Sequence, residues 1–162
     1  MNGPSALRWV WLSALVIALD QLTKHLADAL LAWNQPLPLL PSLNLTLVYN
    51  TGAAFNFLSD AGGWQRWFFV GLGLVAAVVM VIWLTRLPRR ERLGGAAVAL
   101  ILGGALGNVI DRVIYGHVID FIDVYYGRWH WPAFNLADSA ITVGVGLLIL
   151  DGLLGARRPA TG

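Results

Sequence analysis

Four stretches of this chain are apolar over about the 20 residues that an α-helix needs to cross a membrane. They cover residues 9–31, 67–84, 93–112 and 135–156. Only 12% of the 162 residues are charged and 57% are hydrophobic, whereas about a quarter of a soluble domain is charged. The sequence therefore predicts an all-α membrane protein, a bundle of four transmembrane helices that forms a single domain over residues 1–162.

The basic residues predict how this bundle is oriented. The loop 85–92 carries four arginines, Arg8 precedes the first helix, and two more arginines follow the last, whereas residues 32–63 contain no Lys or Arg. Positive residues concentrate on the cytoplasmic side of a membrane protein. We therefore expect both termini to be cytoplasmic, and residues 32–66 and 111–134 to form external loops. Trp and Tyr residues gather near the external boundary, as in an interfacial aromatic belt.

The first external region, residues 33–63, contains a strand pattern. Leu43, Leu45, Leu47 and Tyr49 occupy alternate positions, which is the period of a half-buried strand. The Asn-Thr-Gly sequence that follows is typical of a turn. We expect a small external β element between the first and second helices; the alternative is an ordered loop whose only role is connection.

Polar residues also occur inside the predicted helices. Asp20 and Lys24 are four residues apart, so they share a helix face and can pair. Such a buried pair is as consistent with an architectural role as with a catalytic one. Asn108, Asp111 and Arg112 share a face near the end of the third helix, where Asp111 and Arg112 can also simply mark its end.

Two carboxylates, near the third and fourth helices, suggest a catalytic acid–base pair. Asp120 follows the third helix and Asp138 opens the fourth, so both are expected near the external membrane surface. Two carboxylates in close contact share a proton, which supplies one base and one acid for peptide hydrolysis. The chain has no cysteine and its histidines lack metal-ligand spacing, so neither thiolate nor metal chemistry is expected. Carboxylates in a bundle also serve proton relays and cation sites, so on these residues alone a transporter or channel remains an equal alternative.

Five motifs, in order, carry a resemblance to a known family. They read DQLTK at 20–24, YNTGAAF at 49–55, GGALGNVIDR at 103–112, VIDFI at 118–122 and FNLADSAI at 134–141. With them the chain resembles the bacterial lipoprotein signal peptidases (signal peptidase II) over essentially its whole length.

The resemblance implies an aspartic endopeptidase of the inner membrane, with its active site near the periplasmic surface. Its substrates would be prolipoproteins that carry a diacylglyceryl group on a cysteine, cut just before that cysteine; membrane lipids would be its other partners. It would act as a monomer, without a cofactor, a metal or nucleic acid. By motif position the catalytic residues are Asp120 and Asp138; Asp123, three residues further on, does not match the motif. The supporting or substrate-binding residues are Asp20, Lys24, Asn50, Gly52, Asn108, Asp111, Arg112 and Asn135.

Overall fold

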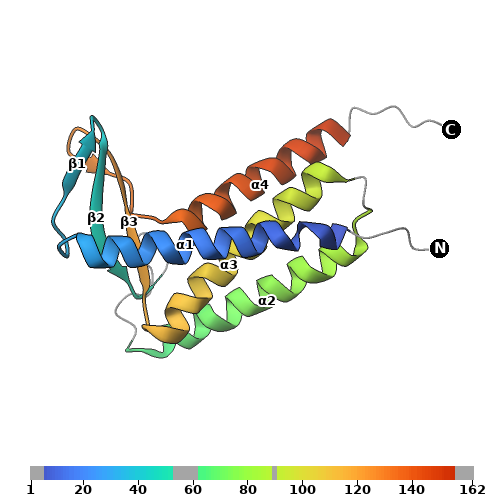
Figure 1. The fold of residues 1–162 in the computed structure, drawn as a ribbon, viewed down its shortest axis with the longest axis horizontal. Helices are drawn as coiled ribbons and strands as arrows, with labels where there is room; N and C mark the ends of the chain where they lie inside the picture. The colour runs from blue at the N-terminus through green and yellow to red at the C-terminus, as the bar shows by residue number, and fades with distance from the viewer. Residues whose placement is uncertain (1–5, 53–61, 89–90, 156–162) are drawn as a thin grey trace.

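The computed structural model describes residues 6–52, 62–88 and 91–155. Within them, four helices are long and apolar enough to cross a membrane. A short 3-10 turn, η1 (Ala6–Trp9), leads into α1 (Val10–Leu30), and the others are α2 (Trp64–Arg86), α3 (Arg92–Ile114) and α4 (Leu136–Gly155). All four run along the long axis of the molecule, with a small sheet at one end and the start of α1 and end of α4 at the other (Figure 1). The predicted four-helix membrane architecture is confirmed.

The third helix lies at the centre of the bundle. It contacts α1, α2 and α4, and a larger share of it is buried than of any other described span. Two of its glycines allow this close packing. A Cβ on Gly104 would collide with the backbone carbonyl of Ala137, and one on Gly107 would lie 2.6 Å from the carboxylate of Asp20. Glycine therefore brings α1 and the beginning of α4 against the same stretch of α3.

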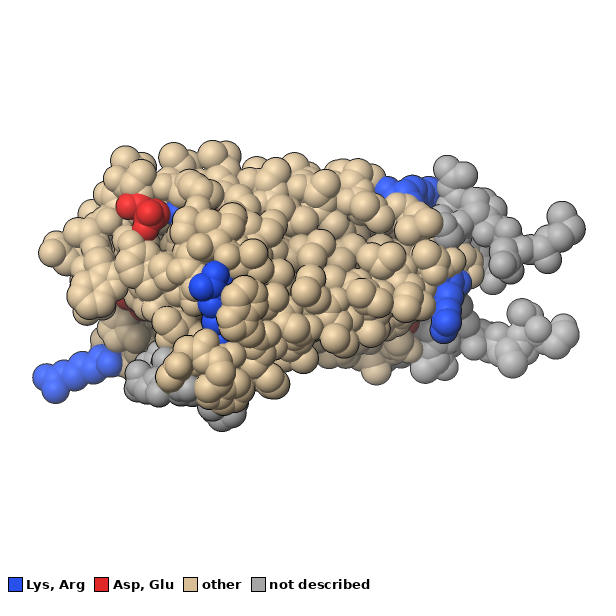
Figure 2. All heavy atoms as spheres, turned by 90° about the horizontal axis from the view of Figure 1, so that it is seen from below, with Lys and Arg blue, Asp and Glu red and all other residues tan. Residues whose placement is uncertain are grey.

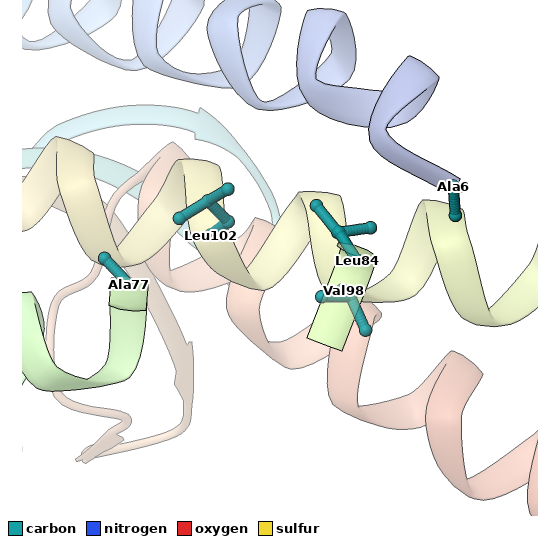
Figure 3. Packing of buried hydrophobic residues seen from close by; sticks show 5 residues of the cluster. All are labelled: Ala6, Ala77, Leu84, Val98 and Leu102. Carbon is teal, nitrogen blue, oxygen red and sulfur yellow. The ribbon is translucent and has the colours of Figure 1, made fainter. Parts of the chain in front are cut away.

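The apolar core lies away from the sheet. Ala6, Ala77, Leu84, Val98 and Leu102 form one buried cluster that joins η1, α2 and α3 (Figure 3). Around the outside, large apolar side chains on α2 and α4 are exposed, and a broad band of one face carries no charged side chain (Figure 2). In a bilayer this surface faces hydrocarbon, which solvates apolar side chains as well as a core does.

The sheet has four antiparallel strands in the order β1-β2-β3-β4. β1 (Leu37–Leu40) and β2 (Leu43–Asn50) lie between α1 and α2, and β2 contains the four alternating residues that predicted a strand there. β3 (Val118–Tyr126) and β4 (Trp129–His130) lie between α3 and α4, in a region that the sequence analysis treated only as a loop. The two aspartates of β3 are three residues apart, with apolar residues at most other positions, so the sequence does not show the alternation of polar and apolar residues that predicts a strand.

The buried face of β2 is partly polar. Asn44, Thr46 and Leu47 are buried, whereas Leu43 and Leu45 are only half-buried. The pairing of β2 with β3 shifts between Leu45 and Val48, as at a β-bulge. The alternating leucines thus predicted the strand but not its buried face: Asn44 and Thr46 point inward, and at the shift Leu47 does so as well.

Candidate active site

Asp120 lies on β3 and Asp138 lies in the first turn of α4, and both line one pocket at the sheet end of the bundle. Asp120 is almost fully buried, with 2% of its surface exposed. Its Oδ1 accepts a hydrogen bond from Asn135 Nδ2 at 2.7 Å, and its Oδ2 accepts one from Asn50 Nδ2 at 3.1 Å. Burial, and then the charge of Asp138, raise the pKa of Asp120 to about 7, although the two asparagine donors act in the opposite direction. Near neutral pH this carboxyl group can therefore hold or release a proton.

Asp138 is fixed by the beginning of its own helix. Its Oδ2 accepts from the backbone N–H of Asn135 at 3.2 Å, while the Oδ1 of Asn135 accepts from the backbone N–H of Asp138 at 2.9 Å. This reciprocal arrangement is that of a capping box, which satisfies free N–H groups at a helix start. The second oxygen, Oδ1, accepts from Asn108 Nδ2 at 2.8 Å. Both carboxylate oxygens of Asp138 thus face hydrogen-bond donors.

Asn108 is oriented by Lys24. The ammonium group of Lys24 donates to Asn108 Oδ1 at 3.0 Å, and Asn135 Nδ2 approaches the same oxygen at 3.2 Å. Because a lysine can only donate, the oxygen of Asn108 must face it, and the amide NH2 is left to face Asp138.

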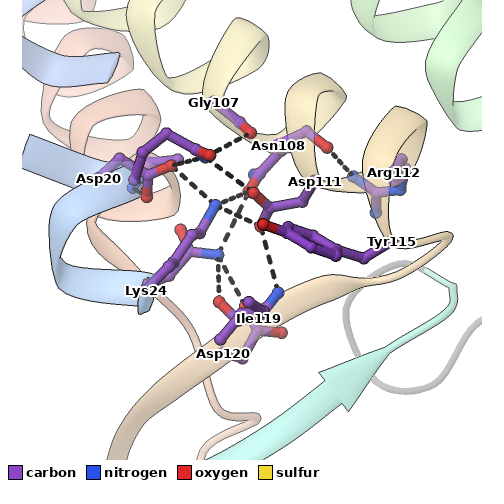
Figure 4. Close-up of polar contacts among 12 residues, drawn as sticks. Asp20, Lys24, Gly107, Asn108, Asp111, Arg112, Tyr115, Ile119 and Asp120 are labelled. Atoms are coloured by element: carbon purple, nitrogen blue, oxygen red, sulfur yellow. Dashed lines mark hydrogen bonds and ion pairs between the residues drawn. The ribbon is translucent and has the colours of Figure 1, made fainter. Parts of the chain in front are cut away.

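Lys24 is the centre of a buried ionic cluster. Its Nζ lies 2.8 Å from Asp20 Oδ2 and 2.9 Å from Asp111 Oδ2, and all three side chains are almost inaccessible (Figure 4). The predicted pairing of Asp20 with Lys24 is therefore present, with Asp111 as a second carboxylate. Asp20 Oδ1 also accepts from the backbone N–H of Ala137, and Asp111 Oδ2 from that of Ile119. The cluster thus links α1 and α3 to the segments that carry both pocket aspartates.

Arg112 borders the pocket on the other side. Its guanidinium donates to the carbonyl oxygen of Gly52 at 2.8 Å and lies 5.1 Å from the ring centre of Phe69. Gly52 in turn donates its N–H to Asn50 Oδ1 at 3.0 Å. Arg112 therefore supports the turn that holds Asn50 against Asp120. The rest of this motif, residues 53–55, lies outside the described residues.

The pocket has a volume of about 700 Å³ and a mixed lining. Its polar lining includes the two aspartates, and its apolar lining includes residues 131–134 together with Ile141 and Val143 of α4. Thr142 and Val143, which also line it, are exposed on the outer surface of α4. The pocket therefore reaches the lipid-facing side of the bundle.

The sequence model of the signal peptidase (SPase) II family matches residues 12–154, nearly the whole chain. The chain belongs to the signal peptidase II family. Proteins named lipoprotein signal peptidase are similar to it throughout. The one from Hydrogenovibrio crunogenus is 53% identical over 91% of this chain and 86% of its own length. The one from Cupriavidus taiwanensis is 55% identical over 97% of this chain and 89% of its own length.

Solved structures agree with the fold of this family member. A bacterial membrane enzyme determined by the in meso method at 2.3 Å superposes with a TM-score of 0.85 and 30% identity, over 96% of this chain and 93% of its own. A second bacterial membrane enzyme, determined by the same method at 1.9 Å, gives a TM-score of 0.76 and 31% identity, over 94% of this chain and 97% of its own.

All ten residues that the family motifs single out lie in or beside this site, whereas Asp123 does not line the pocket. Asp123 is hydrogen-bonded to Asn44, Thr46 and His130, and these bonds outweigh the effect of burial and hold the pKa of Asp123 below its usual range.

Sequence reasoning missed Gln21, which donates to Asp111 Oδ1 at 2.8 Å. It also missed Phe69. Gln21 falls inside the DQLTK motif and so carried a signal, whereas Phe69, in the uncharged stretch 67–84 of α2, carried none.

Proposed function

We propose that this chain removes signal peptides from diacylglyceryl-modified prolipoproteins by cutting just before the lipidated cysteine, with Asp120 and Asp138 as its catalytic pair. The observation that carries the proposal is that Asn135 bonds both carboxyl groups, which line a pocket that is also lined by the apolar residues 131–134. Family membership supports the reaction class. The shape of the pocket supports a substrate with a polar peptide bond beside apolar groups.

The two aspartates have different roles in this proposal. Asp120, whose pKa is about 7, is the acid, and Asp138, with donors at both oxygens, is the base. A water molecule attacks the peptide carbonyl carbon while Asp138 takes its proton and Asp120 protonates the carbonyl oxygen. When the resulting gem-diol collapses, the C–N bond breaks and the amine takes the proton from Asp138. A hydroxyl proton of the gem-diol then returns to Asp120, which restores the starting pair.

The remaining pocket residues position the substrate and the pair. Asn108 and Asn135 hold the carboxyl groups in place, and Lys24, Asp20 and Asp111 support Asn108 and the start of α4. Fixing reacting groups in this way lowers the entropic cost of the reaction. The opening at Thr142 and Val143 lets a substrate enter from the bilayer, so its acyl chains and signal helix stay in hydrocarbon.

The protein would lie in the inner membrane with the sheet on the periplasmic side. Arg8, Arg86 and Arg92 lie at the end opposite the sheet, as cytoplasmic basic residues do. Three arginines lie at the sheet end: Arg66 donates to the carbonyl of Arg112, Arg112 donates to that of Gly52, and Arg128 is exposed in the turn between β3 and β4. Arg89, Arg90, Arg157 and Arg158 lie outside the described residues. One chain supplies both carboxyl groups and their donors, which supports action as a monomer.

The test is direct conversion of a precursor. Purified protein in lipid or detergent is incubated with a diacylglyceryl-modified prolipoprotein, and the products are identified by mass spectrometry. We expect two products, a free signal peptide and a chain that begins with the lipidated cysteine. An intact precursor, or cleavage at another bond, would contradict the proposal.

A further inference from the structure

A second carboxylate of β3, Asp123, is buried outside the catalytic pair and accepts three hydrogen bonds. Its Oδ2 accepts from Asn44 Nδ2 at 3.0 Å and Thr46 Oγ1 at 3.1 Å, both on β2. Its Oδ1 accepts from His130 Nδ1 on β4 at 2.7 Å. One side chain of β3 therefore binds both neighbouring strands.

We propose that Asp123 and His130 form a positioning pair that holds the apolar wall of the substrate pocket, residues 131–134, against the sheet. The inference rests on the proposed function, since the role given to this wall is to contact the precursor. Asp123 and His130 touch none of the reacting groups and act through the wall.

The wall is tied to β3 by its backbone at both ends. The N–H of Trp131 donates to the carbonyl of Val124 at 2.8 Å, and that of Phe134 donates to the carbonyl of Ile122 at 3.1 Å. The carbonyl of Phe134 also accepts from Ile122 N–H at 2.8 Å. Between these ends, Pro132 has no N–H to donate. All four wall residues line the pocket.

The His130 side chain strengthens the weaker of these two ends. β4 has only two residues, lies at one edge of the sheet, and pairs with β3 through Tyr125–His130 and Tyr126–Trp129. A pairing this short gives little stability on its own. The imidazole of His130 stacks on Tyr125, with ring centres 5.2 Å apart, and its Nδ1 reaches the ionised Asp123. A hydrogen bond to a charged group is stronger than one between neutral groups. His130 therefore fixes the strand from which the wall begins.

The wall joins the support of the catalytic pair at Phe134, which precedes Asn135, whereas His130 acts on the other end of the wall, at Trp131. The side-chain donors to Asp120 and Asp138 are Asn50, Asn135 and Asn108, and none of them belongs to the wall or contacts Asp123. Loss of the His130 bond should therefore weaken precursor binding and leave the chemical step unchanged.

The first test compares three substitutions of His130 in the full-length protein. His130→Ala should raise KM for the lipidated precursor about tenfold and leave kcat within about twofold, as expected when binding rather than chemistry is affected. His130→Asn should restore KM, because its Nδ2 takes the place of Nδ1. His130→Gln, whose amide reaches instead toward the position of Nε2, should not restore it. His25→Ala is the matched control: His25 is also exposed at the sheet end, but it contacts Tyr115.

The outcomes distinguish a positioning role of His130 from direct contact with the substrate and from a role in the chemical step. Rescue by Gln and not by Asn would mean that the outer side of the ring contacts the substrate, and would overturn the proposal. An equal fall of kcat and kcat/KM in His130→Ala would overturn it too, since that indicates a lost transition-state contact.

The second test needs no activity. The chain has no cysteine, so Ala133→Cys carries a single nitroxide label on the wall. Its electron paramagnetic resonance spectrum should show faster motion when His130→Ala is added, and the original motion with His130→Asn. Unchanged motion in His130→Ala would overturn the positioning role. If the wild-type protein cleaves no lipidated precursor, the proposed function fails, while this spectrum still decides whether the pair holds the wall.

Discussion

Asn135 and Asp138 hydrogen-bond each other twice across the start of α4, at 2.9 Å and 3.2 Å. The side-chain amide of the same Asn135 also donates to Asp120 at 2.7 Å. The helix cap is therefore the bridge between the two carboxyl groups of the pocket. A substitution that destabilises the beginning of α4 must also disturb the relative position of Asp120 and Asp138.

The first prediction concerns the identity of the catalytic pair. Asp120→Asn and Asp138→Asn should each abolish cleavage, because one removes the acid and the other the base, while both proteins still insert and fold. Asp123→Asn should keep its kcat, because Asp123 does not line the pocket. Cleavage is followed by gel shift of the precursor, and folding by thermal unfolding. Normal cleavage by Asp120→Asn would remove Asp120 from the mechanism.

The second prediction concerns pH. Since Asp120 acts as the acid with a pKa of about 7, activity should fall as pH rises above about 7. The hydrogen bond from Asn50 lowers this pKa, so Asn50→Ala should raise it and move the alkaline limb of the kcat/KM profile to higher pH. His25→Ala serves as a control and should leave the limb in place. A limb that moves to lower pH in Asn50→Ala would contradict the assignment of the acid.

The same pKa has a consequence for stability. Folding raises the pKa of Asp120 from its ordinary 3.8 to about 7, so the folded protein binds this proton more tightly than the unfolded chain. The resulting stabilisation is complete at pH values below the pKa of Asp120 in the unfolded chain, and it is lost as pH rises through about 7. Asp120→Asn cannot ionise, so its thermal midpoint should change less than that of the wild type between pH 4 and pH 7, measured by scanning fluorimetry.

The sequence predicts the helices and the site better than it predicts the sheet. A stretch of about 20 mostly apolar residues crosses a bilayer as an α-helix, so the four spans can be predicted from composition. The spacing of Asp20 and Lys24 predicts their pairing because a helix brings residues four apart onto one face. Apart from its two aspartates, β3 consists of the residue types that favour strands, but it lacks a period of two because those aspartates fall three residues apart. The two residues of β4 are too few to show a period.

The bonds between elements could not be read from the sequence at all. Asn135 is 15 residues from Asp120, and Lys24 is 84 residues from Asn108. Only the packing of α1 and α4 on the glycines of α3 brings these groups together. Motif order identifies such residues, but their partners depend on the fold.

The third prediction concerns Lys24. Lys24→Met should lower the free energy of unfolding by about 3–5 kcal/mol, because it leaves the carboxylates of Asp20 and Asp111 buried without their cation. It should also reduce cleavage, since Lys24 orients Asn108 toward Asp138. Lys24→Met with Asp20→Asn should recover part of the stability. A single variant as stable as the wild type would show that the cluster is not architectural.

The fourth prediction concerns orientation. The absence of cysteine allows single cysteines to report accessibility. Arg128→Cys, exposed in the turn between β3 and β4, should react with a membrane-impermeant maleimide applied outside the inner membrane. Thr85→Cys, exposed near the end of α2, should react only after the membrane is opened. Labelling of Thr85→Cys from outside would reverse the proposed topology.

The fifth prediction is that cleavage requires the lipid on the substrate. Two acyl chains anchor the modified cysteine in the bilayer, and each buried methylene contributes about 0.8 kcal/mol. That anchor holds the neighbouring peptide bond at the depth of the pocket, which is lined by Asp120 and Asp138 and extends to the exposed Thr142 and Val143. Binding energy from a remote part of a substrate can be used in this way to position the reacting bond.

A precursor without the lipid keeps its apolar signal helix, so it still reaches the membrane, but its scissile bond lacks the second anchor. We therefore expect the lipidated precursor to be cleaved and the unlipidated one to be ignored, measured in the same vesicles by mass spectrometry. A cysteine alkylated with a short polar group is the matched control, because it blocks the thiol without adding hydrocarbon. Equal cleavage of all three substrates would refute the anchoring argument even if both aspartates proved essential, because the signal helix alone would then suffice to place the bond.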